Sequence, residues 1–138
     1  MAFWRCYYHI IWATKNRSLW ITPQIERVIF ATIREKASEL ETEILAINSV
    51  SDHIHAAVCI PPKLSVAEWV KQMKGTSTRD INRQFPDLET SFSWQQSYGV
   101  LTFGAKHSKF VVNYVESQKE HHANQTLEPY LEQIDDDT

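Results

Sequence analysis

The order of elements expected along this chain, β-α-β-β-α-β-α, predicts an α+β fold of the ferredoxin-like (RRM-like) kind, with helices on one face of an antiparallel sheet. Two observations predict it. Strand-like apolar runs alternate with segments whose apolar residues recur at helical spacing, and the order without the final helix is the split β-α-β pattern. That topology places the first and third strands at the sheet centre. Side chains on those strands therefore stand on a rigid platform, and a C-terminal helix is added to the sandwich.

The first half of the chain supplies the strand, the helix and the two strands that open this pattern. Residues 3–12 are apolar and aromatic, which is typical of a strand. Thr22 before Pro23 indicates a helix start, because threonine caps the first turn and proline fits the first helical position. Residues 44–50 and 53–60 are again strand-like, and a tight turn is expected to join them.

A second helix is expected after the third strand. Ser65 with Glu68 fits a capping box, so this helix should run from residue 66 to about residue 74. Because glycine disfavours a helix interior, we expect Gly75 to interrupt it, with a further helical segment over residues 76–84.

The last third of the chain predicts one more strand and one more helix. Residues 94–103 have strand character, and residues 106–122 read as a long helix. We expect residues 1–123 to form a single domain and residues 124–138 to form a loosely packed acidic tail that contains Asp135–Asp137.

The composition excludes several classes of protein. A chain of 138 residues with 43 % hydrophobic residues fits one folded domain rather than a disordered segment. No apolar run approaches the length of a membrane span, and the first residues lack a signal-peptide pattern, so we expect a cytoplasmic protein with Cys6 and Cys59 reduced. The net charge of −3 argues against non-specific coating of nucleic acid.

Two histidines in the predicted third strand are candidate metal ligands. His53 and His55 are two residues apart, so their side chains share one face of a strand, as two ligands of one ion must. Imidazoles suit Zn, Mn, Fe or Ni, whereas Mg²⁺ requires more oxygen ligands. The same spacing is common in packed or exposed histidine pairs, so the interpretation depends on the rest of the site.

The predicted last helix carries a candidate nucleophile. Tyr114 and Gln118 are four residues apart and therefore lie on one helical face, which directs a phenol and an amide carbonyl to the same place. With the histidine pair, they would form a metal-assisted site that attacks phosphodiesters through tyrosine. A core tyrosine and a solvated glutamine are the alternatives. His121 could share this face, whereas we assign His122 to a favourable interaction with the helix dipole.

Two groups of basic and hydroxyl side chains are candidate contacts to phosphates, since half or more of protein–DNA hydrogen bonds go to the backbone. A solvated surface is the alternative for both groups. They comprise Lys15 and Arg17 in the first loop, and Lys71, Lys74, Thr76, Ser77, Arg79 and Arg83 around the second helix.

The chain resembles the single-tyrosine HUH transposases of the smallest bacterial insertion sequences, together with their REP-associated relatives. The similarity runs from about Tyr7 to His122. It is specific because several short motifs occur together and in the same order as in the family. It is carried by Tyr8–Arg17, by Ser51–His55 as the HUH motif, by Lys74–Ser77, by Trp94–Gly99 and by Tyr114–His122 as the catalytic helix.

The resemblance implies an enzyme that cuts and rejoins single-stranded DNA near hairpins at the ends of a mobile element. Tyr114 would attack the scissile phosphate and form a 5′-phosphotyrosine bond, while His53, His55 and Gln118 would hold Mg²⁺ or Mn²⁺. The resemblance also implies a homodimer in which the catalytic helix crosses between subunits, so that composite sites form, although some REP-associated relatives act as monomers.

Two other classes of protein fit parts of the sequence. One is a ferredoxin-like module that binds single-stranded nucleic acid without cutting it, against which the presence of Tyr114 and Gln118 argues. The other is a zinc-dependent hydrolase with His53, His55 and a histidine from His121–His122 as ligands, in which Asp52 is the nearest candidate base.

Overall fold

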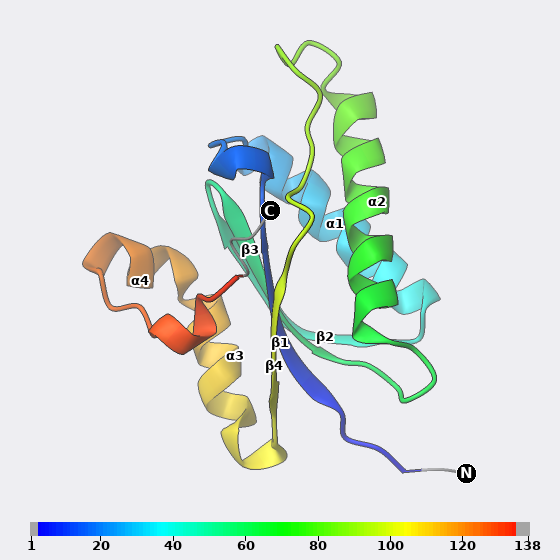
Figure 1. Ribbon diagram of the computed structural model, residues 1–138, viewed down its shortest axis with the longest axis vertical. Helices are drawn as coiled ribbons and strands as arrows, with labels where there is room; N and C mark the ends of the chain where they lie inside the picture. The colour runs from blue at the N-terminus through cyan, green and yellow to red at the C-terminus, as the bar shows by residue number, and fades with distance from the viewer. Residues whose placement is uncertain (1–2, 135–138) are drawn as a thin grey trace.

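A four-stranded antiparallel sheet with the strand order β2-β3-β1-β4 organises the chain, in a computed structural model that describes residues 3–134 (Figure 1). The predicted α+β sandwich is confirmed, and β1 and β3 occupy the sheet centre as expected. Both pairings of β1 and the pairing of β2 with β3 are antiparallel. The strands are β1 (Tyr7–Ala13), β2 (Glu43–Val50), β3 (His53–Cys59) and β4 (Gly99–Phe103).

Helices α1 (Pro23–Glu39) and α2 (Val66–Gln84) cover one face of the sheet. Both begin at the predicted caps: the Thr22 hydroxyl accepts a hydrogen bond from a backbone N–H in the first turn of α1, and the Ser65 hydroxyl does the same for α2. Isoleucines on α1 and the apolar side of α2 pack against the alternate residues of β1 and β3 that face them. This layer is the main hydrophobic core.

Helix α2 runs without interruption through Gly75, so the predicted break at this residue is wrong. Glycine costs a helix interior about 1 kcal/mol relative to alanine. Gly75 lies on the exposed side of α2, and burial of the opposite side, which includes Trp69, Met73 and Ile81, outweighs that local cost.

Two shorter helices cover the other face of the sheet, where the sequence predicts one long helix (Figure 1). They are α3 (Ser108–Glu116) and α4 (Gln118–Asn124), and Ser117 between them departs from helical geometry with φ −98° and ψ 18°. Strand β4 begins at Gly99, later than predicted, and Trp94 instead forms an isolated bridge with Thr14.

The segment after α4 packs against the molecule, contrary to the expectation of a loose tail. A single 3₁₀ turn at Pro129–Leu131 directs it back to the sheet, and Leu131 and Ile134 are buried. The backbone oxygen of Gln133 would lie 2.0 Å from a Cβ built at Gly99, so only glycine permits this close approach to β4. Asp135–Asp137 lie outside the described residues.

No helix within residues 3–134 combines the length and the apolar character that crossing a membrane requires.

Candidate metal and nucleophile site

The histidine pair lies on the face of β3 that points away from α1 and α2. In the antiparallel register His53 is opposite Ala13 and His55 is opposite Ile11, and these β1 residues form an apolar patch separate from the main core. Both imidazoles are buried, and their ring centroids are 5.1 Å apart. The shared strand face that the spacing predicts is therefore confirmed.

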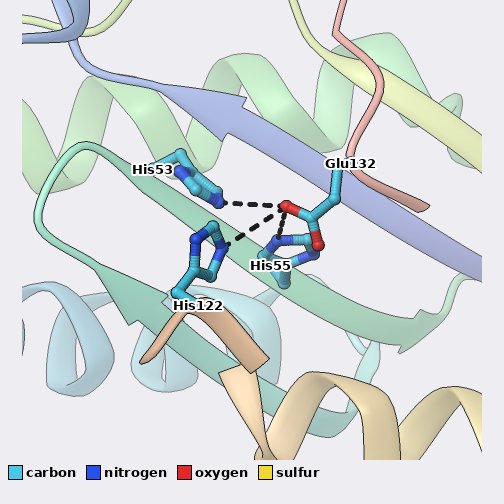
Figure 2. Close-up of side chains that lie close together, drawn as sticks. All are labelled: His53, His55, His122 and Glu132. Carbon is cyan, nitrogen blue, oxygen red and sulfur yellow. Dashed lines mark hydrogen bonds and ion pairs between the residues drawn. The ribbon is translucent and has the colours of Figure 1, made fainter. Parts of the chain in front are cut away.

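One carboxylate oxygen joins three histidines at this place (Figure 2). Oε1 of Glu132 lies 3.3 Å from Nε2 of His53, 3.2 Å from Nε2 of His55 and 3.5 Å from Nε2 of His122. The donor atoms of the four side chains all lie within 4.8 Å of one another. Strand β3, helix α4 and the C-terminal segment thus meet in one cluster, which we call the histidine cluster.

Tyr114 points at the histidine cluster of its own chain. Its hydroxyl donates a short hydrogen bond to Oε2 of Glu132 and accepts one of 3.0 Å from the backbone N–H of Glu128. The phenol ring stacks on His121, with centroids 4.6 Å apart, and meets His55 edge-on at 6.1 Å. The seven-residue spacing that predicts a shared face for Tyr114 and His121 is confirmed.

Gln118 is fully buried beside the cluster, although the sequence allowed a solvated side chain. Its Oε1 lies 3.0 Å from Nε2 of His122, and its amide nitrogen donates weak 3.4 Å hydrogen bonds to the Tyr114 carbonyl and to Glu132. The amide oxygen therefore faces His122 rather than the His53–His55 pair.

A set of polar contacts fixes α4, and with it His122, against the sheet. The ammonium group of Lys119 donates to Glu26 and Asn48 at 2.7 Å each, and to the Ser49 carbonyl at 3.1 Å. The Asn48 amide also donates to the carbonyl of Glu116 at the end of α3. Glu26 belongs to α1 and Asn48 to β2, so both layers hold the break between α3 and α4 in place.

Each histidine of the pair has a polar partner behind it. Nδ1 of His53 donates to Asp52 at 2.7 Å, and Arg17 lies 3.9 Å from the same carboxylate. Nδ1 of His55 shares a 2.8 Å hydrogen bond with Nε2 of His9, which is buried in β1. Such partners orient metal-ligating imidazoles and fix their tautomers.

Burial and charge set the protonation of the cluster. Burial lowers the pKa of His9 to about 3 and that of His55 to about 4, so both imidazoles are neutral. Burial also acts against the charged form of His53, but its hydrogen bond to Asp52 and the nearby carboxylate of Glu132 outweigh this effect and leave its pKa raised.

Glu132 and Tyr114 have opposite responses to the same surroundings. Burial alone would raise the pKa of Glu132, but the adjacent imidazoles of His53 and His55 hold it well below its usual range, so the carboxylate is ionised. Burial and the adjacent carboxylate raise the pKa of Tyr114 to about 12, so the phenol keeps its proton in this arrangement.

The residues present fit a bound metal ion. Among residues 3–134, the buried Nε2 of His53 has no hydrogen-bond partner, since the nearby Glu132 oxygen does not lie in the direction of a hydrogen bond. An unsatisfied buried nitrogen is costly unless another group, such as a cation, uses its lone pair. Imidazole nitrogens and a carboxylate are common ligands of divalent transition metals.

The basic side chains predicted around α2 lie apart from the histidine cluster. Lys71, Lys74 and Arg79 line a cavity of about 570 Å³ together with Trp94 and Tyr98. The Lys74 ammonium donates to the backbone carbonyls of residues 95 and 97, at 2.6 and 2.8 Å, and burial lowers its pKa to about 8. Lys74 therefore fastens the segment before β4 onto α2.

The other predicted DNA contacts divide between surface and interior. Ser77 is fully buried, donates to the Met73 carbonyl and accepts from Trp94, so the structure gives it a packing role in place of the predicted DNA contact. Arg83 is exposed and pairs with a carboxylate on its own helix. The remaining positions are Thr76, which is half-buried, and Lys15 and Arg17, which are exposed in the loop after β1.

Sequence reasoning missed His9 and Glu132 as members of this site and offered His122 only as an alternative zinc ligand. His122 does not stand alone at a helix end, as we assigned it; its four-residue spacing from Gln118 was the signal that both face the cluster. His9 alternates with apolar residues in β1, but its facing direction depends on the sheet register. Glu132 lies in a segment without periodicity, so nothing local indicated its position.

Comparisons with known proteins identify related sequences in one family. A family model described as "Transposase IS200 like" matches residues 2–118. The transposase for insertion sequence element IS200 of Salmonella typhimurium is 31 % identical over 121 residues, which cover 85 % of this chain and 79 % of that protein. The ISDra2 transposase TnpA of Deinococcus radiodurans is 26 % identical and covers 80 % of this chain and 82 % of that protein.

Solved structures share the fold. A crystal structure of a protein assigned as a transposase, from Deinococcus radiodurans R1, superposes with a TM-score of 0.70 at 27 % identity, covering 85 % of this chain and 93 % of that one. A REP-associated tyrosine transposase bound to a REP hairpin gives a TM-score of 0.65 at 18 % identity, covering 88 % and 74 %.

Proposed function

The chain belongs to the IS200-like transposase family, and we propose that it cleaves and rejoins single-stranded DNA at hairpin-containing element ends through a covalent bond to Tyr114. The observation that carries this proposal is the direction of the Tyr114 hydroxyl. It points into the histidine cluster, where Glu132 links it to His53 and His55. A phenol of the protein and a candidate metal centre thus face the same space.

The chemistry is a transesterification at phosphorus. The Tyr114 oxygen forms a bond to the scissile phosphate, the bond from phosphorus to the 3′-oxygen breaks, and the phenol proton is lost. The products are a 5′-phosphotyrosine and a free 3′-hydroxyl. Because the covalent intermediate conserves the phosphodiester energy, a 3′-hydroxyl can attack it and reseal a strand without ATP.

His53, His55 and Gln118 are the residues that we propose to hold Mg²⁺ or Mn²⁺ during cleavage. A bound divalent ion would polarise the phosphate and stabilise the charge that develops on it. The protein contributes the orientation of its ligands: Asp52 fixes the ring of His53, and His9 fixes that of His55. Gln118 reaches the cluster from the helix turn that follows Tyr114.

DNA contacts are proposed at two places. Arg17 lies beside Asp52, directly next to His53, so the loop with Lys15 and Arg17 borders the cluster. The cavity lined by Lys71 and Arg79 offers a second basic surface with aromatic side chains. The hairpin bound by the REP-associated relative supports a hairpin as the ligand of this chain.

The homodimer with composite sites stays a prediction. Within residues 3–134 a single chain already brings Tyr114 to its own His55. Mixing inactive His53→Ala protein with inactive Tyr114→Phe protein separates the arrangements, because only exchange of helices between subunits creates an intact site. Restored cleavage supports the composite dimer. If the subunits exchange and the mixture still shows no cleavage, the result supports a site within each chain.

A zinc-dependent hydrolase is the second candidate, and the position of His122 favours it, because that histidine supplies the third imidazole such a site requires. The candidate base Asp52 is engaged with His53, however, and is not free to activate a water. A hydrolase also does not require a tyrosine directed at the cluster, whereas a phosphotyrosine mechanism does.

The decisive experiment captures covalent DNA–protein adducts with single-stranded hairpin libraries. We expect wild-type protein to form adducts and Tyr114→Phe protein to form none, while its fold and its DNA binding persist. Tyr130→Phe is the control, because that tyrosine is exposed and loses the same hydroxyl group. Adducts at the wild-type level in Tyr114→Phe protein would exclude this nucleophile.

A further inference from the structure

The separations between one oxygen of Glu132 and three imidazole nitrogens match the edges of a tetrahedral metal site. In such a site, with metal–ligand distances of about 2.0–2.1 Å, neighbouring ligand atoms lie about 3.3–3.4 Å apart. Oε1 of Glu132 lies 3.3, 3.2 and 3.5 Å from the Nε2 atoms of His53, His55 and His122. A cation bound here would replace the protons that His55 shares with Glu132 and that His122 donates to Gln118.

We infer that His122 and Glu132 join His53 and His55 as ligands of a divalent transition metal in the DNA-free protein. The inference rests on the proposed function, which places a metal at the histidine pair, and extends it to two residues beyond the matched residues 2–118. Three imidazoles and one carboxylate favour ions such as Zn²⁺, Co²⁺ or Mn²⁺ over Mg²⁺, which prefers oxygen ligands.

Packing of the neighbouring residues fixes the position of Glu132. Its neighbours Leu131 and Ile134 are buried, and Gln133 crosses β4 at Gly99, where no side chain would fit. The backbone of Glu128 donates to the Tyr114 hydroxyl and fixes the start of the turn. The chain is therefore held on both sides of Glu132, and this directs its carboxylate into the cluster.

The four-ligand shell has a consequence for DNA. A tetrahedral site with four protein ligands is closed, whereas a catalytic site needs a position for substrate. Oε2 of the same carboxylate binds the Tyr114 hydroxyl, where the scissile phosphate must approach. Phosphate and Glu132 are both anionic oxygen donors, so they compete for one position, and productive DNA binding displaces Glu132 from it.

Metal titration of the full-length, DNA-free protein tests the ligand set without relying on cleavage. Calorimetry with Zn²⁺ and Co²⁺ would compare wild type with Glu132→Gln and His122→Ala. Loss of an orienting partner alone costs 10- to 100-fold in metal affinity, so we expect each variant to lose at least about tenfold. Glu120→Gln is the matched control, because Glu120 is exposed on α4, and it should stay within about twofold of wild type.

Visible absorption of Co²⁺ bound to the wild type reports the coordination number of the metal. This measurement does not depend on how well any variant folds. Four-coordinate tetrahedral Co²⁺ absorbs far more strongly than six-coordinate Co²⁺, so we expect an intense spectrum that weakens when a single-stranded hairpin is added. A weak, six-coordinate spectrum in the DNA-free protein, or an unchanged metal affinity in folded Glu132→Gln protein, would overturn the inference. Neither result bears on adduct formation by Tyr114, so the proposed function can stand when this inference fails.

Discussion

The two faces of the central sheet differ in what they bury. Along β3, Ile54, Ala56 and Val58 point toward α1 and α2 and join a continuous apolar core. The alternate residues of β3, which face the opposite side, include His53 and His55, and these contact charged and aromatic groups. One strand thus contributes to stability on one side and to chemistry on the other, because successive side chains alternate.

The difference shows why the reactive face can carry costly groups. Burying an imidazole is unfavourable unless its nitrogens find partners, and each histidine of the pair has one behind it. The apolar patches on this face are small, at Ala57 with Val111 and Val115, and at Ile11 with Ala13 and Ile134. We therefore expect the core face to supply most of the stability that holds the histidine cluster in place.

Substitution of the two histidines on the reactive face of the sheet should have the largest effect on cleavage. We expect His53→Ala and His55→Ala each to lower metal-dependent cleavage by about a thousandfold or more, which corresponds to about 4 kcal/mol in the barrier. Adduct formation on a single-stranded hairpin measures the loss. Chelation with EDTA should reproduce it in wild type, and added Mn²⁺ should reverse the chelation; full activity in excess chelator would contradict the metal site.

Substitution of the residue between the two histidines, which faces the core, should affect stability rather than cleavage. Ile54 is fully buried, and isoleucine-to-alanine changes in cores cost about 2–5 kcal/mol. We expect Ile54→Ala to lower the free energy of unfolding in urea by this amount, while cleavage per folded molecule stays near wild type. A loss of cleavage comparable to that of His53→Ala, in fully folded Ile54→Ala protein, would show that the two faces are not separable.

A smaller effect is expected one contact away from the histidine pair. His9→Phe removes the hydrogen bond to Nδ1 of His55 but keeps an aromatic ring in β1. Because such partners tune ligand orientation, metal affinity should fall about 10- to 100-fold with little change in unfolding free energy. His107→Phe is the control, since His107 lines the same cavity as His9 but is exposed; equal losses in both variants would exclude an orienting role for His9.

The smallest expected effect lies at the border of the reactive face. If Lys15 and Arg17 contact phosphates, each neutral substitution should reduce the salt dependence of binding to single strands by about 0.7 in log–log slope. Fluorescence anisotropy at several salt concentrations measures this for Lys15→Gln and Arg17→Gln. The exposed Lys63→Gln serves as control; identical slopes in all proteins would remove this loop from the DNA path.

Local pattern was sufficient to predict much of the fold and part of the site. The caps at Thr22 and Ser65 and the strand alternation at His53 and His55 depend on neighbours within a few residues, so they were visible in the sequence. The same local rules failed at Gly75, where packing of α2 outweighs glycine's helix cost. They failed again at Ser117, where contacts to β2 and α1 hold a break in the last helix.

The order of elements, the central position of β3 and the shared face of its two histidines follow from short-range patterns of alternation and capping, so they could be predicted. The groups that meet that face come from distant parts of the chain. His55 and Glu132 are 77 residues apart, and their contact depends on the sheet register, the docking of α4 and the return of the C-terminal segment over Gly99. Such contacts arise from the packing of the whole chain, and no local sequence pattern encodes them.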